Sequence, residues 1–337
     1  MVVCGGAYRL PAPREDVADP GDPPAGVDPH AAPQWRAART HRNLAATEFL
    51  ADTLPIARIC IGPGSLALML GAQPGFSPET VWFNPTMAAD ADPENRPPLT
   101  IDPANEWMAI HEQTARACAD LARGRYGVGC QDLVENIDIL ASLREPQNLL
   151  MDMIERPGWV EQKVWEINAA WIEAYSRIYE AIRFQDGSSC WGAFGLWGPG
   201  KTAKVQCDAS AMFSPAMFKQ FVVPALTAQC QWLDFSMFHL DGHQCIPHLE
   251  HLLEIDELDA IEWTPDPQVP HGSHPDWYPM YRRIRQAGKS VQAVGVRLED
   301  LQPMLDAAGP EGMYLEMHCP NGRADFEKAM ELTEAYR

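Results

Sequence analysis

The sequence predicts an α/β protein with a (β/α)8 TIM barrel in one domain, preceded by an extended N-terminal arm. Three observations support this prediction. The chain has 337 residues, of which 46% are hydrophobic, so it can form a large packed core. Short apolar runs alternate with stretches of helical periodicity along most of the chain. The number of apolar runs is about eight, which is the number of strands in this barrel.

The arm comprises residues 1–33, which are rich in Pro, Gly, Ala and Asp and have little core of their own. The barrel is expected over residues 34–337, with helical spacing first, over 34–54. Strands are expected at residues 55–62, 80–85, 125–130, 188–195, 235–242, 258–266, 289–296 and 312–319. Helices are expected at residues 103–123, 131–143, 160–182, 214–233, 245–255, 277–288, 298–309 and 323–336. A doubly wound open sheet is the alternative architecture, because the strand count decides between the two.

The composition excludes several classes of protein. The chain has 46 acidic and 26 basic residues and no run of Lys and Arg, which argues against a nucleic-acid-binding surface. No apolar stretch approaches the ~20 residues of a membrane helix, and the N-terminus lacks the pattern of a signal peptide. The nine cysteines show no close pairing and are expected to be free thiols. We therefore expect a soluble, cytoplasmic protein that acts on a small molecule.

Residues 195–202, GLWGPGKT, match the phosphate-binding pattern G-x-x-x-x-G-K-[ST]. Pro199 removes one N–H group from the expected phosphate cradle, and the residues after Thr202 lack the long apolar stripe of the helix that such a loop opens. We therefore expect a loop at the rim of the barrel. In that loop, Lys201 would bind an acidic group of a substrate or cofactor as a point charge.

Candidate metal ligands follow two of the expected strands. His239 and Asp241 lie two residues apart at the end of a strand, so their side chains point to the same face. The last strand ends in His318 and Cys319, of which only one faces inward, and we favour Cys319. His239, Asp241 and Cys319 would hold Zn²⁺ or a similar ion with one open position, as in catalytic zinc sites. Without a metal, His239 and Asp241 would form a hydrogen-bonded pair.

Two acidic residues are candidates for contact with the substrate. Asp208 follows the residues KVQC and would orient the substrate or act as a base, although it could equally cap a helix. Glu135 follows the expected strand 125–130 and would lie near the same mouth of the barrel. It could instead begin a helix, where an acidic residue favours the helix dipole.

The second half of the chain contains FSPAMFKQFVVPAL, then FHLDG, then LDAIEWTP, and resembles the uroporphyrinogen decarboxylase superfamily. The resemblance implies a TIM barrel. Its corrinoid and coenzyme M methyltransferase branch is the more similar one and carries His-x-Cys-Gly where this chain has His239-Leu-Asp241-Gly, with a later cysteine in the region of Cys319. In that branch zinc activates an acceptor thiol, which the resemblance implies here. Because Asp241 stands in place of a cysteine, the identity of the metal and the use of a thiol acceptor stay open.

The decarboxylase branch is less similar, because its Arg-rich RQAGRY-type segment near the N-terminus is missing here. The corrinoid-binding motif D-x-H-x-x-G is absent too, so a corrinoid would be free or supplied by a partner protein. We expect a methyltransferase or demethylase that moves a methyl group between a small methylated or thiol compound and a corrinoid or thiol. A metal-free decarboxylase or lyase and a non-catalytic corrinoid- or metabolite-binding barrel are the alternatives. A homodimer is compatible with each of these functions.

Overall fold

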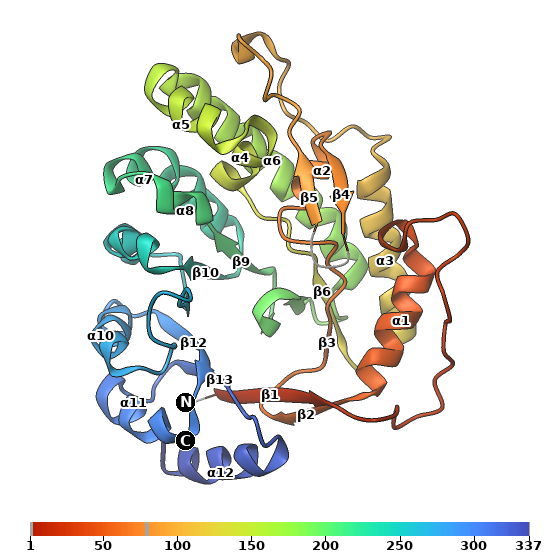
Figure 1. The fold of residues 1–337 in the computed structure, drawn as a ribbon, viewed down its shortest axis with the longest axis vertical. Helices are drawn as coiled ribbons and strands as arrows, with labels where there is room; N and C mark the ends of the chain where they lie inside the picture. The colour runs from red at the N-terminus through yellow and green to blue at the C-terminus, as the bar shows by residue number, and fades with distance from the viewer. Residues whose placement is uncertain (1–2, 78–80, 337) are drawn as a thin grey trace.

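The fold was obtained as a computed structural model that describes residues 3–77 and 81–336. The strands form a ring surrounded by helices, which confirms the predicted TIM barrel (Figure 1). None of the described helices is both long enough and apolar enough to cross a membrane.

The main sheet contributes most of the barrel wall. Its order is β2-β1-β13-β12-β11-β10-β9, and all neighbouring pairs are parallel except β1 with β2. The strands are β1 (Val3–Arg9), β2 (Thr47–Ala51), β9 (Thr202–Gln206), β10 (Phe235–Asp241), β11 (Ala260–Thr264), β12 (Ser290–Val296) and β13 (Met313–Met317). Helices connect the successive parallel strands from β9 to β13, so this half of the chain has the predicted βα repeat.

A second sheet completes the ring, in the order β3-β6-β7-β8. Its strands are β3 (Ile56–Ala57), β6 (Gly127–Cys130), β7 (Ser189–Trp191) and β8 (Leu196–Gly198). Ser189 links the two sheets, because its hydroxyl donates to the Gly200 carbonyl at 2.6 Å and accepts from the Thr202 N–H at 3.2 Å. On the opposite side of the ring, β2 is the outer strand of the first sheet and β3 that of the second. These two described strands do not pair with each other, so the two sheets are not joined there.

Several strands differ from the sequence prediction. The predicted strand 80–85, whose first residue lies outside the described part, contains β5 (Val81–Asn84). It pairs with β4 (Gln73–Phe76) as a separate antiparallel hairpin and is not a strand of the wall. The prediction also lacks β1, β2 and β9 of the main sheet, and β9 shows why. Its polar residues Lys204 and Gln206 alternate with Ala203 and Val205, and all four are buried.

The helices are α1 (Pro33–Ala45), α2 (Leu66–Met69), α3 (Glu106–Ala122), α4 (Asn136–Arg144), α5 (Pro146–Glu155), α6 (Pro157–Ile182), α7 (Pro215–Phe221), α8 (Val223–Trp232), α9 (Leu249–Leu253), α10 (Tyr278–Gln286), α11 (Leu301–Ala308) and α12 (Arg323–Thr333). The predicted helix 214–233 is two helices, because Pro224 has no N–H to continue the helical hydrogen bonds. The helical spacing over 34–54 ends at Ala45, and β2 follows.

The first residues of the expected arm belong to the wall. β1 lies between β13 and β2, and the ring of Phe326 from α12 covers it at Gly6. A Cβ atom at Gly6 would lie 2.3 Å from that ring, so the close approach of α12 requires glycine. Residues 10–28 continue without a helix or strand. The division at residue 33 stays a prediction.

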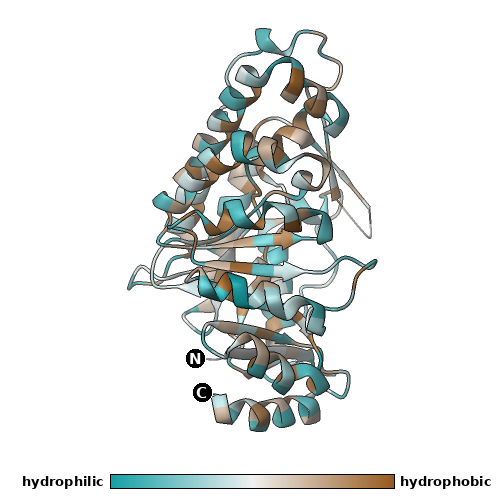
Figure 2. Ribbon diagram, turned by 90° about the vertical axis from the view of Figure 1, so that its left-hand side faces the viewer, coloured by the Kyte–Doolittle hydropathy of each residue, from teal (hydrophilic) through white to brown (hydrophobic). Residues whose placement is uncertain are grey.

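Each strand presents one face to the helices and the other to the lumen. On β10, Phe238 faces the helices and packs against Phe218 of α7, with ring centroids 6.5 Å apart. Its neighbour His239 faces the opposite way, into the lumen. Figure 2 shows hydrophobic and hydrophilic residues alternating along the strands. The lumen is therefore lined by polar side chains and enclosed by an apolar layer under the helices.

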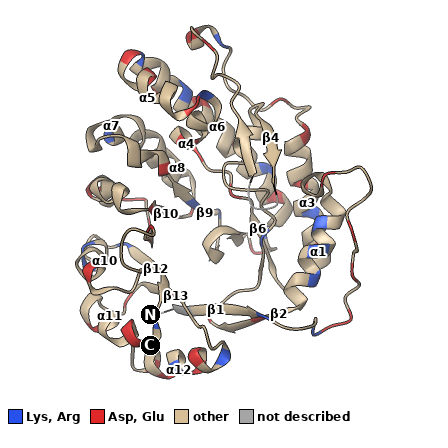
Figure 3. Cartoon of the chain, in the orientation of Figure 1, with Lys and Arg blue, Asp and Glu red and all other residues tan. Residues whose placement is uncertain are grey.

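Charged residues are dispersed over the molecule. Figure 3 shows Lys and Arg scattered among Asp and Glu on the helices and loops, with three arginines each on α1 and α10. This distribution agrees with the expectation that the protein lacks a broad basic surface.

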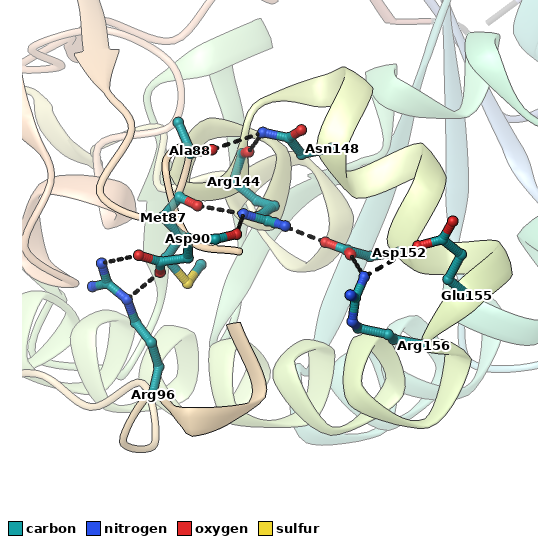
Figure 4. A network of polar contacts seen from close by, with 9 residues as sticks. All are labelled: Met87, Ala88, Asp90, Arg96, Arg144, Asn148, Asp152, Glu155 and Arg156. Carbon is teal, nitrogen blue, oxygen red and sulfur yellow. Dashed lines mark hydrogen bonds and ion pairs between the residues drawn. The ribbon is translucent and has the colours of Figure 1, made fainter. Parts of the chain in front are cut away.

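A buried ion pair fixes α4 and α5 against the loop after β5. Arg144 bonds Asp152 at 2.7 Å and also donates to the carbonyls of Met87 and Asp90, at 2.5 and 2.8 Å (Figure 4). Arg156 binds the second oxygen of Asp152 at 2.8 Å. Arg144 and Asp152 are 5% and 1% exposed, so their charges are neutralised away from water.

Candidate functional site

Three side chains with metal-binding atoms meet at the C-terminal ends of β9 and β10. They are Asp208, His239 and Asp241, and one donor atom of each lies within 4.8 Å of the others. His239 pairs with Gln206 in the register of the two strands, so Asp241 is level with Asp208. Because side chains alternate along a strand, His239 and Asp241 both face the lumen. The C-terminal mouth of the barrel is where TIM-barrel enzymes place their active sites.

Glu262 on β11 orients His239. The two residues are directly opposite in the strand register, and a hydrogen bond joins His239 Nδ1 to a carboxylate oxygen of Glu262. The other oxygen of Glu262 accepts from Thr264 Oγ1 at 2.6 Å, and Glu262 is fully buried. Burial opposes the charged imidazole, but the hydrogen bond and charge of Glu262 outweigh it and raise the pKa of His239. With Nδ1 engaged, Nε2 is the nitrogen left for a metal or substrate.

Asp138 of α4 holds the turn that carries Asp208. Its carboxylate accepts from the backbone N–H groups of Asp208 and Ala209, at 2.9 and 2.8 Å. The Asp208 carboxylate accepts from the side-chain amide of Gln206 at 2.7 Å. Partial desolvation and then the charge of Asp138 raise the pKa of Asp208 to about 7. Negative charge is therefore crowded at this mouth, and a bound cation would relieve it.

Glu135 lies deeper in the barrel, beside β9. It is fully buried, and one of its oxygens accepts from the Gln206 N–H. Its Oε2 has no hydrogen-bond partner among the described residues, and burial raises its pKa well above the ordinary value. Lys204 is also buried and forms an ion pair with Asp132 at 2.7 Å. Glu135 thus supports the strand that leads to Asp208.

The structure does not bring Lys201 or Cys319 to the three donors. Lys201 precedes β9 and so lies at the end of the strand opposite Asp208, where its ammonium is 4.3 Å from the ring centroid of Trp232. The GPGKT segment therefore leads into a strand, and a phosphate-binding loop would lead into a helix. Cys319 lies beyond the end of β13, is half-buried and packs against the core. Burial and then Asp325 raise its thiol pKa to about 11.

Sequence analysis missed two features of this site. It placed Asp208 as a substrate-binding residue, whereas the structure places its carboxylate among the metal-type donors. It also did not single out Glu262 or Asp138 as partners. The signal in the sequence was polar alternation: Glu262 and Thr264 are two residues apart in an otherwise apolar strand, as His239 and Asp241 are. The pairing between strands, which joins Glu262 to His239, is absent from the sequence pattern.

No model of a protein family matches the sequence, and no curated protein sequence matches it. Among solved structures, a methyltransferase from Methanosarcina mazei is similar over 91% of this chain and 87% of its own, with a TM-score of 0.60 and 12% identity. A B12-independent methionine synthase from Shewanella sp. W3-18-1, in complex with selenomethionine, matches 66% of this chain and 64% of its own. That match has a TM-score of 0.41 and 12% identity. At this identity the first likeness concerns the fold alone, and it agrees with a TIM barrel.

Proposed function

We propose that the protein is a metal-dependent enzyme that transfers a methyl group to or from a small molecule. The observation that carries the proposal is the convergence of Asp208, His239 and Asp241 at the C-terminal mouth. The fold shared with a methyltransferase and the sequence resemblance to the corrinoid and coenzyme M methyltransferases support the choice of methyl transfer.

The three residues fit a divalent ion. Two carboxylates and one imidazole form an oxygen- and nitrogen-rich donor set that suits Zn²⁺, and three protein ligands leave a position for substrate. Desolvation, then the charge of Asp138 and, more weakly, that of Asp241 raise the pKa of Asp208, and a bound cation would oppose each of these effects. A bound Zn²⁺ would supply Lewis acidity and lower the pKa of a thiol or water at its open position.

The remaining residues have supporting parts in this proposal. Glu262 fixes the tautomer and the ring orientation of His239, and Asp138 fixes the turn of Asp208 through two backbone N–H groups. Phe194 covers one side of His239, with ring centroids 4.8 Å apart, and keeps water from that side. We propose that the methyl group passes between the small molecule and a corrinoid. The corrinoid would be free or held by a partner protein.

Methylcobalamin with a small thiol, such as 2-mercaptoethanol, tests the proposal in a spectrophotometric assay. The thiol sulfur forms the new bond to the methyl carbon, the cobalt–carbon pair stays with cobalt, and the thiol proton passes to solvent. We expect zinc-dependent loss of the methylcobalamin spectrum with wild-type protein and at least a hundredfold slower loss with Asp208→Ala. Lys201→Ala is the matched control and should keep the wild-type rate. No transfer by zinc-loaded wild-type protein with any of several thiols, or equal rates in all variants, would exclude the proposal.

A metal-free decarboxylase or lyase is the second candidate, and one observation favours it. The pKa of Asp208, about 7, is that of an effective proton donor or acceptor at neutral pH. In that function Asp208 and His239 would be the acid and base. The activity of a metal-free enzyme would survive complete removal of metal by a chelator and would be lost in Asp208→Asn. Methyl transfer at a zinc site would be lost after chelation as well as in Asp208→Asn.

A further inference from the structure

A cavity of about 450 Å³ opens through the barrel wall between β2 and β3, and we call it the side cavity. It lies where the two sheets are not paired with each other. Its size is that of a small-molecule site. Three residues of its lining carry the argument: Arg58 after β3, Gly195, and Glu316 on β13.

Arg58 and Glu316 face this cavity with opposite charges. Neither side chain forms a hydrogen bond, or an ion pair within 4 Å, with any other residue in the described part of the chain. They are nevertheless near enough for the positive charge of Arg58 to act on Glu316: burial raises the pKa of Glu316, and Arg58 partly offsets that rise. Both residues are exposed, so each can bind a ligand that occupies the cavity.

The side cavity lies beside a turn that contacts His239. A turn at Ala193–Gly195 lies inside the ring of strands, the green turn near the middle of Figure 1. Gly195 lines the cavity, while the ring of its neighbour Phe194 packs against His239. The side-chain amide of Gln292 on β12 donates to the Phe194 carbonyl at 3.3 Å and holds the turn in this position. The same turn therefore borders the side cavity and contacts His239.

We propose that the side cavity binds a small zwitterion, with its carboxylate on Arg58 and its cationic nitrogen on Glu316. The guanidinium offers paired donors that match a carboxylate, and the Glu316 carboxylate supplies the complementary charge. Joined to the proposed function, on which this step rests, the zwitterion is the substrate, held beside the turn that contacts His239. Binding itself is independent of that function.

Isothermal titration calorimetry on the wild-type protein, with four matched probes, tests the charge requirement. Norleucine and 6-aminohexanoate carry both charges, at different separations, on six carbons. Hexanoate lacks the amine, and pentylamine lacks the carboxylate. We expect at least one zwitterion to bind and each singly charged probe to bind at least tenfold more weakly. Failure of both zwitterions to bind, or equal binding of hexanoate or pentylamine, would overturn the proposal.

Substitutions locate the site. Arg58→Gln and Glu316→Gln should each weaken binding of the preferred zwitterion at least tenfold, and Lys201→Gln, at the opposite end of the barrel, should leave it unchanged. His239→Ala separates the two proposals, because it should abolish methyl transfer while zwitterion binding persists. Methyl transfer without zwitterion binding would refute only the side-cavity proposal. Zwitterion binding without methyl transfer would refute only the proposed function.

Discussion

At the scale of single residues, polar side chains buried in the lumen determine the chemistry that the barrel can support. Lys204, Gln206 and Glu262 are each at most 4% exposed, yet each is held by a hydrogen bond or an ion pair. Buried polar groups of this kind are costly unless their partners are in place. They therefore fix the orientation of the residues at the mouth.

Glu262 is the residue whose effect on the site is most specific. Glu262→Gln should weaken zinc binding about 10- to 100-fold, because His239 loses the charged partner that fixes its tautomer and makes it a better ligand. A competition titration against a chromogenic chelator measures the affinity. Glu299→Gln removes an exposed acidic residue and should leave the affinity unchanged. Equal affinities of wild-type protein and Glu262→Gln would remove Glu262 from the site.

Arg144 should contribute to stability far more than its neighbour Arg156. Arg144→Met removes one of the two ion pairs of the buried Asp152 and the two hydrogen bonds to the carbonyls of Met87 and Asp90. We therefore expect a loss of about 3 kcal/mol in the free energy of unfolding. Arg156→Met removes a more exposed partner and should cost about 1 kcal/mol or less. Urea unfolding followed by circular dichroism compares them. A loss with Arg156→Met as large as that with Arg144→Met would contradict this account.

At the scale of elements, Glu48 on β2 ties together parts that are far apart in the sequence. It is 7% exposed and accepts from Tyr8 on β1, Arg323 on α12 and Arg14, the last at 2.8 Å. The hydrogen bond from Tyr8, and then those from the two arginines, lower the pKa of Glu48 to about 2. Glu48 therefore joins the N-terminal strand pair to the last helix.

The lowered pKa of Glu48 predicts a dependence of stability on pH. The folded protein binds the Glu48 proton less tightly than the unfolded chain, so this contribution is fully present above about pH 4.5 and is lost as the pH falls towards 2. Glu48→Gln should lower the midpoint of thermal unfolding at pH 7, and the difference from wild type should shrink below pH 4.5. Differential scanning calorimetry at several pH values measures this difference. A gap that stays constant or widens on acidification would contradict the assignment.

β9 and β5 show what the sequence can and cannot reveal about elements. β10 reads as a strand because apolar residues fill most of it, and His239 and Asp241 stand out at its end. β9 carries Lys204 and Gln206 at its lumen-facing positions, where Lys204 forms an ion pair with Asp132 and the Gln206 N–H donates to Glu135. Those partners are remote in sequence, so its polar half resembles a loop. β5 has a strand composition, but the antiparallel pairing with β4 removes it from the wall.

At the scale of the whole molecule, the barrel and the place of its mouth could be predicted from the alternation of strands and helices, together with His239 and Asp241. The third donor could not. Sequence analysis assigned Cys319 because it ends a strand, but Asp208 is the residue that the register of β9 and β10 brings beside Asp241. The side cavity could not be predicted from the sequence either, because it arises where β2 and β3, which are separated by one short loop, do not pair with each other.

The central claim is that Asp208, His239 and Asp241 bind one zinc ion, and metal stoichiometry tests it most directly. Protein loaded with zinc, passed through a desalting column and measured by mass spectrometry of the metal should retain close to one ion per chain. Asp208→Ala and His239→Ala should lose it while keeping the wild-type circular dichroism spectrum, and Cys319→Ala should keep it. Wild-type protein that retains no zinc, or zinc that is lost in Cys319→Ala and kept in Asp208→Ala, would contradict the account.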